Sequence, residues 1–589
     1  MHSPFYSQSS ASRACLRIGV LFNDGRQPAW VAEVLWQIAQ SNFAKVELAV
    51  YNAKQVPRRT LLTSILDMLR DAKVRRGPLF RLYARWDRRR IRGESDPFQK
   101  KDVTDLLGEA AVLRVNALSA GPVDRFPADA IESIRAMNLD VLLRFGFNIL
   151  RGDILTAARY GVWSYHHGDN EFYRGGPPCF WEMVEGNQLT GAMLQVLTED
   201  LDAGRILCRG FFATRAGGSW VRNRVQPYWG ASTFVIEKLR QLHEQGWEKL
   251  ERDIAPPQPY RGKRKIYKAP TNVEMARWLA RRFAAQAVAA VTWLPRRLRT
   301  DYWKLGIHVA TETQTGSAPA QDISQFRWIE PPRGHFYADP FLFRFESRRW
   351  LFFEDFDYRT RLGTIAAAEV MADGKMGPPI RVLERPYHLS YPCVFQVDGQ
   401  VFMIPESRAN GTVEMYRCRK FPCEWEPARV CLEASAVDTT VWSENGVHWF
   451  FVTLREARGG ALQLWLFSST GIEDEWRPHP ANPISTDVRS SRGAGAIFRD
   501  GGRLIRPSQD CSGNYGRSFT LNEILVLNEN EYREQSCVTV EAPHGMIGTH
   551  TYARLGEMEV VDGCAWASVF SVMGLAEIWT RVRRKLRLT

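Results

Sequence analysis

The sequence predicts a multidomain chain in which a Rossmann-like α/β domain precedes an all-β five-bladed propeller. Three observations lead to this fold class. The chain of 589 residues is longer than one hydrophobic core usually serves. Its first part alternates short apolar runs with helical patterns, and beyond residue 330 hairpin-like segments recur at a regular interval.

The N-terminal elements alternate between strand and helix. Apolar runs at 16–22, 46–51 and 141–145 predict strands, and apolar periodicity at 29–40 and 127–137 predicts helices. This alternation is typical of a parallel sheet with crossover helices. No GxGxxG pattern accompanies it, so a dinucleotide site has no support.

The C-terminal half is periodic. Extended runs joined by polar turns begin roughly 50 residues apart, and several of the turns are Asp-Gly or Asn-Gly. The five segments begin at Ala338, Tyr391, Val437, Gly493 and Gly548. Repeated hairpins at this interval predict a propeller with five blades.

The region between these parts reads as a connector. A helix from Ser232, as its N-cap, to about residue 251 ends before the proline-rich break at 256–259. Residues 271–300 then form an amphipathic basic pattern, for which packing between domains and contact with a membrane surface both stay open. The predicted domains are an α/β domain at 16–255 with a basic insertion at about 57–105, a basic linker at 256–330, a propeller at 331–565 and a basic C-terminal helix at 566–589.

Composition limits the function classes. A formal charge of +13 favours anionic partners, although the basic residues are concentrated in predicted connectors and on helix surfaces. Ten cysteines without a CxxC pair indicate reduced thiols and give no metal site. No apolar stretch is long enough to span a bilayer, so we expect a cytoplasmic location, with peripheral contact at the inner membrane surface left open.

One stretch of the α/β part carries candidate catalytic residues. The strand-like run 162–165 contains Ser164 and is followed by His166 in a polar loop that ends in Tyr173-Arg174-Gly175. Asp202 lies in a later Leu-Asp-Ala-Gly turn. A histidine that moves protons needs a carboxylate or carbonyl to fix its tautomer, and this order of residues can supply one.

These motifs resemble the catalytic domain of folate-dependent formyltransferases, the group of the methionyl-tRNA and sugar N-formyltransferases. That family has an Asn-x-His pair, a Tyr-Arg-Gly loop and a Leu-Asp-x-Gly turn, and Ser164 replaces its asparagine here. The resemblance implies that His166 is the acid/base or oxyanion-polarising group and that Asp202 orients it. It further implies 10-formyltetrahydrofolate as donor, with a pocket formed by Phe145, Gly146, Phe147, Arg174 and Gly175.

The repeats resemble the propeller-like domain of glucosamine inositolphosphorylceramide transferases, itself related to five-bladed glycoside hydrolases. The motifs that carry the likeness include 337–340, 386–392, 404–406 and 437–440. Asp339, Glu406 and Asp438 are candidates for a sugar site, because paired acids can protonate a leaving oxygen. The second repeat has Tyr391 where those hydrolases would place an acid.

The sequence therefore predicts formyl transfer from 10-formyltetrahydrofolate to the amino group of an amino sugar, a nucleotide-linked sugar or a glycan intermediate. The alternative is a glycan-binding or glycosyl-transferring propeller joined to a catalytically idle formyltransferase-like domain. Specific nucleic-acid binding is not expected, because nothing after residue 256 matches the C-terminal barrel of the methionyl-tRNA enzymes.

Overall fold

A computed structural model describes residues 8–9, 11–53, 77–91, 93–199, 204–215, 218–254, 256, 259–291, 298–310 and 322–572. The chain divides into two compact units, residues 1–285 with 456–461 and residues 286–455 with 462–589. Each unit is described by itself. Among the described residues, no helix is both long and apolar enough to cross a membrane.

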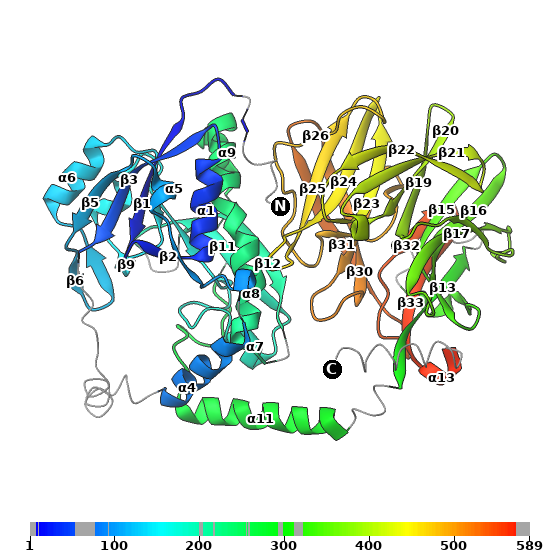
Figure 1. The fold of residues 1–589 in the computed structure, drawn as a ribbon, viewed down its shortest axis with the longest axis horizontal. Coiled ribbons are helices and arrows are strands. Elements are labelled where there is room, and N and C mark those ends of the chain that lie inside the picture. Colours follow the sequence, from blue (N-terminus) through cyan, green and yellow to red (C-terminus); the bar gives the residue numbers. More distant parts are fainter. Residues whose placement is uncertain are drawn as a thin grey trace. The chain divides into compact units, whose positions relative to one another are not determined.

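The first unit is built on a mixed sheet (Figure 1). Its described strands follow the order β12-β11-β10-β8-β1-β3-β5, in which β10, β8, β1, β3 and β5 are parallel and β11 and β12 are antiparallel. The strands of this sheet are β1 (Leu16–Phe22), β3 (Ala44–Asn52), β5 (Ala111–Val115), β8 (Val141–Arg144), β10 (Val162–His166), β11 (Leu189–Val196) and β12 (Arg205–Ala213). The predicted α/β class is confirmed.

Short strands and helices complete this unit. The short strands are β2 (Arg26–Pro28), β4 (Lys100–Asp102), β6 (Leu118–Ala120), β7 (Val123–Arg125) and β9 (Ile149–Leu150). The helices are α1 (Ala29–Ala39), α4 (Pro78–Asp87), α5 (Thr104–Leu107), α6 (Ala128–Ala136), α7 (Trp181–Glu185), α8 (Trp220–Gly230), α9 (Phe234–Gln245), α10 (Trp247–Arg252) and α11 (Asn272–Val291), whose residues from 286 on belong to the second unit. Of the predicted insertion at about 57–105, residues 57–76 lie outside the described residues.

The helix predicted from Ser232 to about residue 251 is wrong in its details. The structure has two helices there, α9 and α10, because Gly246 between them has a φ of 85° and interrupts the helix. Ser232 is no N-cap, since its hydroxyl donates to the carbonyl oxygen of Trp229 at 2.6 Å.

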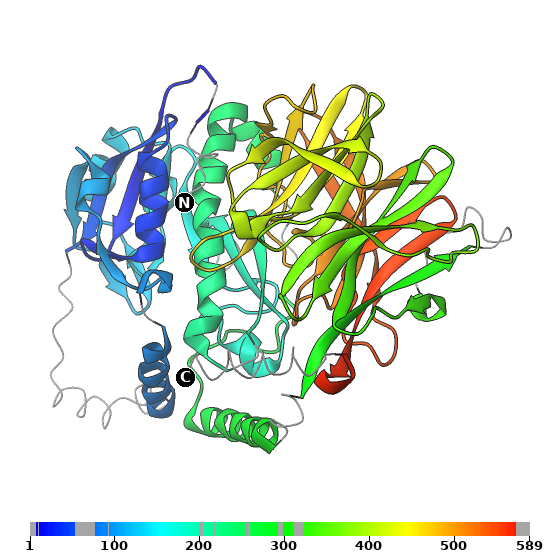
Figure 2. The same ribbon diagram turned by 45° about the vertical axis from the view of Figure 1, so that its right-hand side comes forward.

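The second unit is all-β (Figure 2). Within residues 298–310 and 322–572 the strands form five antiparallel sheets, and the predicted five-bladed propeller is confirmed. The first three sheets are β15 (His335–Phe345) to β18 (Ile380–Leu383), β19 (Ser390–Val397) to β22 (Glu424–Leu432), and β23 (Ala436–Glu444) to β26 (Arg477–Pro478). Their middle strands are β16 (Arg348–Asp357), β17 (Leu362–Val370), β20 (Gln400–Glu406), β21 (Val413–Lys420), β24 (Val447–Arg455) and β25 (Leu462–Ser469).

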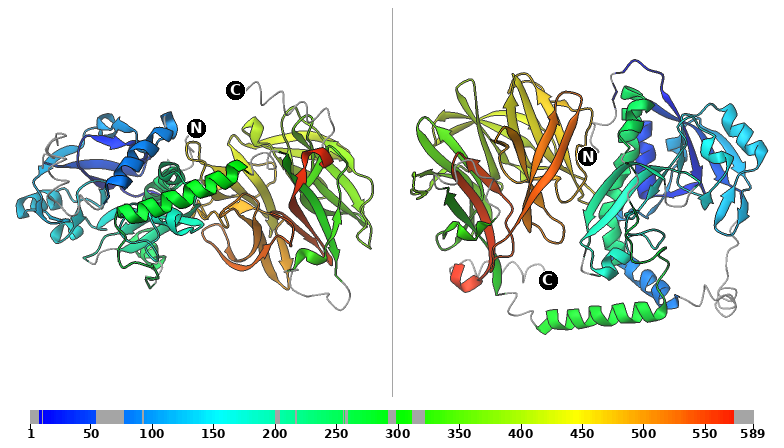
Figure 3. Two further views of the ribbon diagram at one scale, coloured as in Figure 1. Left: turned by 90° about the horizontal axis from the view of Figure 1, so that it is seen from below. Right: turned by 180° about the vertical axis from the view of Figure 1, so that it is seen from behind.

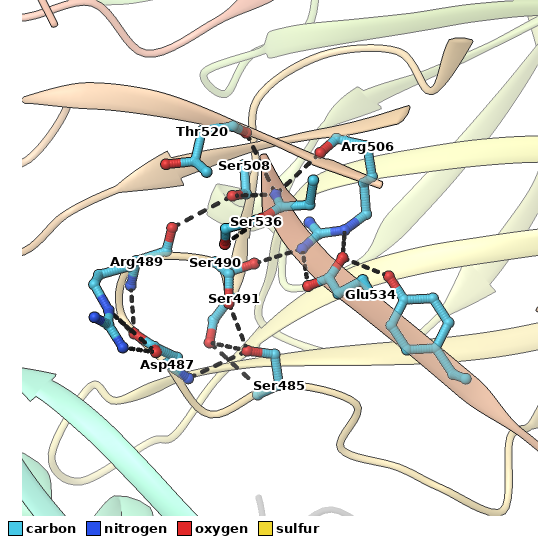
Figure 4. Close-up of polar contacts among 12 residues, drawn as sticks. Ser485, Asp487, Arg489, Ser490, Ser491, Arg506, Ser508, Thr520, Glu534 and Ser536 are labelled. Carbon is cyan, nitrogen blue, oxygen red and sulfur yellow. Dashed lines mark hydrogen bonds and ion pairs between the residues drawn. The ribbon is translucent and has the colours of Figure 1, made fainter. Parts of the chain in front are cut away.

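The fourth sheet contains β27 (Arg492–Gly493), β28 (Phe498–Asp500), β29 (Arg503–Asp510), β30 (Ser518–Leu527) and β31 (Tyr532–Glu541). Figure 4 shows how buried polar groups hold its strands together. The Arg506 guanidinium donates to both carboxylate oxygens of Glu534 at 2.7 and 2.8 Å, and the Tyr532 hydroxyl donates to the same carboxylate at 2.6 Å. A buried charge arranged in this way is paired and hydrogen-bonded.

The fifth sheet closes the ring with strands from both ends of the propeller. Its order is β14-β13-β33-β32, in which β32 (Tyr552–Leu555) and β33 (Met558–Ser568) come from the last repeat. The other two, β13 (Arg299–Val309) and β14 (Arg327–Ile329), precede the first repeat. The inner strands β32 and β15 are in contact, so the last sheet meets the first.

This closure corrects the predicted linker at 256–330 and the predicted C-terminal helix at 566–589. Part of the linker is strand, since β13 pairs with β33 along its whole length from Arg299 to Val309. Strand β33 extends to Ser568 and the short helix α13 (Val569–Val572) follows, while residues 573–589 lie outside the described residues. Figure 3 shows β13 and β33 running beside each other in the second unit.

We expect the closing strand to stabilise the propeller as a whole. Leu305 of β13 is fully buried in a core cluster with Leu351, Phe353 and Val560 from neighbouring strands. Leu305→Ala should lower the free energy of unfolding by about 2–5 kcal/mol, because it removes buried methyl groups and leaves a cavity. The exposed Leu525→Ala is the matched control and should change it by about 0.5 kcal/mol or less. Chemical denaturation of the full chain measures both, and equal effects would contradict the assigned closure.

Candidate functional site

The carboxyl ends of three parallel strands meet at one edge of the first sheet. Strand β1 pairs with β8, and β8 pairs with β10, all in parallel. A Cβ at Gly146 would lie 2.4 Å from the backbone nitrogen of Asn23, so only glycine allows this approach of the loops after β8 and β1. The amide of Phe147 then donates to Asn23 Oδ1 at 2.7 Å. Loops at such an edge are the usual place for a ligand site in an α/β sheet.

Phe145 and Phe147 leave this edge in different directions. Phe145 is half-buried and joins an aromatic cluster with Trp30 and Tyr165, with ring centroids 5.8 and 6.4 Å away. Phe147 has a φ of 64° and packs in the core, 4.9 Å from the ring of Phe126. Of the two, Phe145 is placed to form a wall beside the loop that follows β10.

His166 is the last residue of β10, and the next loop folds back over it. Its Nε2 lies 3.2 Å from the backbone carbonyl oxygen of Tyr173. A Cβ at Gly168 would lie 2.9 Å from the same nitrogen, so glycine is required for this turn. The carbonyl fixes the proton on Nε2, which makes Nδ1 the nitrogen that can accept a proton.

The neighbouring His167 has a structural environment. Its ring stacks on Tyr228 with centroids 3.5 Å apart and is buried. Burial, followed by the charges of His166 and Arg224, lowers the pKa of His167 well below its usual range. A neutral, stacked imidazole has a structural role beside the end of β10.

Ser164, which takes the place of the family's asparagine, is in contact with an arginine. The side chain is buried, and its hydroxyl accepts a hydrogen bond at 3.1 Å from Nη1 of Arg144, its partner across β8 and β10. Burial lowers the pKa of Arg144, and Asp124 opposes this effect. A guanidinium therefore engages the serine hydroxyl, a feature that the sequence analysis missed because Arg144 belongs to no motif.

Asp202 lies outside the described residues, so its predicted role beside His166 stays a prediction. Another carboxylate is present in the His166 loop. Asp169 is buried, accepts from the amide of Glu171 at 3.0 Å and lies 3.8 Å from the Arg209 guanidinium. Burial raises the pKa of Asp169.

Arg174 and Gly175 hold the end of this loop against the segment 260–267. The Arg174 guanidinium lies over the ring of Tyr260 at 4.6 Å and donates through Nε to the carbonyl of Asn170 at 3.0 Å. Gly175 has a φ of 95°, and a Cβ there would lie 2.3 Å from the carbonyl oxygen of Tyr267. The structure thus shows these two residues shaping the loop, and their predicted contact with a pterin stays a prediction.

In the second unit, a repeated bulge aims the first strands of three sheets. The pairing register shifts after Ala338, Ser390 and Val437. In each strand the following residue has a positive φ: Asp339, Tyr391 and Asp438, at 54°, 48° and 49°. A bulge redirects a side chain, so equivalent positions of three repeats carry the two predicted aspartates and Tyr391.

Hydrogen bonds connect these positions. The amide of Tyr391 donates to Asp339 Oδ2 at 3.2 Å, and the Thr551 hydroxyl donates to Asp339 Oδ1 at 2.9 Å. The buried Tyr391 hydroxyl accepts from the amide of Gly495 at 2.7 Å and lies 2.9 Å from Thr440 Oγ1. Tyr391 thus replaces a third acid with a neutral group that joins neighbouring sheets.

The three predicted carboxylates form two groups. Asp438 and Glu406 share Arg492, which pairs with Asp438 and lies 3.7 Å from Glu406 Oε2. Gln509 also donates to Asp438 at 3.0 Å. Burial and the Asp438 charge raise the pKa of Glu406 to about 8. Burial therefore favours the protonated form of Glu406, which lies beside the salt bridge between Asp438 and Arg492.

Asp339 belongs to the second group, with His550 and Asp562. The His550 ring lies 2.5 Å from Asp562 Oδ2 through Nδ1 and 3.6 Å from Asp339 Oδ1 through Nε2. Burial raises the pKa of Asp339 to about 6. Burial by itself would lower the pKa of His550, but the neighbouring Asp562 and Asp339 outweigh this effect, so the pKa of His550 is raised. Donor atoms of the three residues lie within 4.8 Å of one another, a grouping that the sequence analysis did not anticipate. Asp562 already accepts from the amides of Asp339, His550 and Thr551, which explains its placement without an ion.

The two units thus define a formyltransferase-like α/β domain and a sugar-transferase-associated propeller domain. Residues 330–563 match the family described as "Glucosamine inositolphosphorylceramide transferase 1, N-terminal". The chain is 36% identical over 219 residues to glucosamine inositolphosphorylceramide transferase 1 of Arabidopsis thaliana, a match that covers 36% of this chain and 28% of that protein.

The first unit has separate relatives. It is 29% identical over 122 residues to the methionyl-tRNA formyltransferase of Chlorobium limicola. This match covers 20% of this chain and 37% of that enzyme. Glycinamide ribonucleotide transformylase 1 of Symbiobacterium toebii superposes with a TM-score of 0.28 and 15% identity, over 44% of this chain and 100% of that one. Both parts of the chain are therefore similar to parts of transferases, and the chain spans well under half the length of these curated relatives.

The buried acids of the propeller predict a pH dependence. Because Glu406 binds its proton more tightly in the folded chain, the free energy of unfolding should fall as the pH rises from about 4.5 to about 8. Glu406→Gln should reduce this fall, and Asp339 should account for part of the remainder up to a pH of about 6. Denaturant unfolding across this range measures the slope, with the exposed Glu424→Gln as control. An unchanged slope in Glu406→Gln would contradict the raised pKa.

Proposed function

We propose that this chain transfers a formyl group from 10-formyltetrahydrofolate to the amino group of an amino sugar, carried by a nucleotide or a glycan intermediate. The observation that carries the proposal is the oriented His166 at the carboxyl end of β10, in a domain similar to formyltransferases. The domain at 330–563 supports the acceptor class, since its family is named for a glucosamine transferase.

The residues beside His166 fit a flat, polar donor. Phe145 is half-buried and presents an aromatic ring that packs on Trp30 and Tyr165. Asn170 is buried in the loop after His166, and its Oδ1 has no hydrogen-bond partner among the described residues. The folate would supply the formyl carbon, and the chain's own groups would bind it and manage the protons.

Acyl transfer to an amine requires a proton to leave the amine and another to reach the departing nitrogen. In the proposal, His166 Nδ1 takes the amine proton as the new carbon–nitrogen bond forms, and the same imidazolium returns it as the bond to the donor nitrogen breaks. The Tyr173 carbonyl keeps the imidazole in this tautomer. Asp202 would stabilise the positive charge of the imidazolium. Because Ser164 replaces the family's asparagine, no asparagine amide is available to the developing oxyanion, and the His166 imidazolium would stabilise it.

Substitution of His166 tests the mechanism. His166→Gln should lower the rate of formylated product about 10²–10⁴-fold, while binding of a stable 10-formyltetrahydrofolate analogue changes little. The half-buried His335→Gln in the propeller is the matched control and should retain the parent rate. Mass spectrometry of an amino-sugar acceptor gives the rate, and an unaffected His166→Gln enzyme would disprove the assignment.

The second candidate is a glycan-binding or glycosyl-transferring propeller joined to an idle formyltransferase-like domain. It is favoured by the hydrogen bond from Arg144 to Ser164, and by the protonated Glu406 beside Asp438. In that case Asp438→Asn would abolish the activity and His166→Gln would leave it intact. Under either function we expect a cytoplasmic protein that does not bind nucleic acid specifically.

A further inference from the structure

The helices α4 and α11 carry exposed apolar side chains on otherwise basic surfaces. The start of α11 lies beside α4 (Figures 1 and 3). Asn272 accepts from the amide of Leu79 at 3.2 Å, and the rings of Tyr83 and Trp278 are 5.2 Å apart. Helix α4 and the part of α11 up to Ala285 thus pack together within the first unit.

Helix α4 has three distinct faces. Phe80, Tyr83 and Asp87 are buried against the unit. Leu79, Leu82 and Trp86 are three and four residues apart, so they lie along one side of the helix. They form an exposed apolar stripe, in which Leu82 is 65% exposed. The third face and the following turn are basic and exposed, with Arg81, Arg85, Arg88 and Arg89.

Helix α11 shows a similar division. Met275 is fully buried, and Trp278 and Leu279 pack against the same core cluster. Val273 and Phe283 are 66% and 65% exposed, and Phe283 follows Leu279 by one turn, at the margin of the packed face. Arg277 and Arg281 are exposed on the same helix. Large apolar groups left in solvent at this density mark an interaction surface.

We infer that this α4–α11 surface, defined by Leu79, Leu82, Trp86, Val273, Phe283 and the adjoining arginines, binds the surface of an anionic lipid bilayer. The charge is complementary, because α4 and its following turn carry five arginines and one acid, Asp87, which is buried and paired with Arg90. Apolar residues flanked by arginine suit the boundary between lipid headgroups and acyl chains, because the apolar side chains enter the acyl region while the arginines contact the anionic headgroups.

The surface shares a core with the His166 loop. Phe80, Tyr83 and Met275 pack in one cluster with Tyr173, whose carbonyl oxygen meets His166. Bilayer binding would therefore place that loop near the lipid surface. The inference does not depend on formyl transfer, and it is tested by binding alone.

Sedimentation with vesicles tests the inference on the full chain. Vesicles of three parts phosphatidylcholine and one part phosphatidylserine should bind it, and vesicles of phosphatidylcholine alone should bind it at least tenfold less. The double variant Arg85→Ser, Arg89→Ser should weaken binding roughly 30-fold, since each basic residue near an anionic surface contributes about 1 kcal/mol. Added salt should weaken binding of the parent chain for the same reason.

The apolar contribution is tested by Leu82→Glu with Phe283→Glu, which should weaken vesicle binding tenfold or more. The control is Val112→Glu with Leu118→Glu, two similarly exposed residues (61% and 63%) on β5 and β6, and it should bind as the parent does. Far-ultraviolet circular dichroism verifies folding. Equal loss in both pairs, or binding that ignores phosphatidylserine, would overturn the inference. The inference would also be overturned if the variants of this surface left vesicle binding intact and instead changed the sedimentation velocity of the chain or its affinity for RNA. Those results would show that the surface mediates self-association or RNA binding.

Discussion

Pairing of β13 with β33 is the constraint on which the second unit depends. The two strands come from opposite ends of the propeller sequence and pair along eleven consecutive positions, from Arg299 opposite Ser568 to Val309 opposite Met558. This pairing completes the fifth sheet, so that β32 can contact β15 and the inner strands surround a common centre. A closed ring leaves no inner strand free to shift, and its buried charges keep their partners.

The interior charges illustrate that dependence. Asp339 accepts hydrogen bonds from Tyr391 of the second sheet and from Thr551, which directly precedes β32 of the fifth sheet, and Arg492 pairs with Asp438 of the preceding sheet. Of these interactions, the hydrogen bond from Thr551 joins the last repeat to the first, so it depends on closure of the ring. Tyr391 adds neutral bridges at the same level and replaces a charge that would repel Asp339 and Asp438.

In the first unit, the orientation of His166 depends on loops in which glycine residues allow close backbone approaches. Gly146 and Gly168 allow close approach of backbone to Asn23 and to His166, and Gly175 allows it to Tyr267. The strand ends of the parallel sheet bring these loops together, and the loop after β10 turns a carbonyl toward the imidazole. Histidine orientation thus follows from strand order and from small residues at three turns.

Local patterns in the sequence predicted much of this. Leu16–Phe22 was predicted to the residue, and the hairpins of the repeats were found because alternation and tight turns are local signals. The strand β13 was missed because its partner lies at the far end of the propeller, and pairing between distant segments has no local signal. The interaction of Arg144 with Ser164 was missed for a similar reason, since it depends on the register of two parallel strands.

The site residues divide in the same way. Residue types and spacing gave His166 and the three propeller carboxylates as candidates. Those local patterns do not show which of the candidates share a partner. Arg492 and His550 separate those carboxylates into two groups, and both residues come from later repeats. Both lie near the predicted starts of the last two repeats, Gly493 and Gly548, yet only the arrangement of the sheets shows which carboxylates they contact.

Transfer of an isotopically labelled formyl group tests the central claim most directly. The full chain would be incubated with labelled 10-formyltetrahydrofolate and a glucosamine-containing acceptor, and the label would be followed by nuclear magnetic resonance. The account predicts a labelled formamide on the sugar nitrogen. Label that stays on the folate, or is released only as formate, would contradict it.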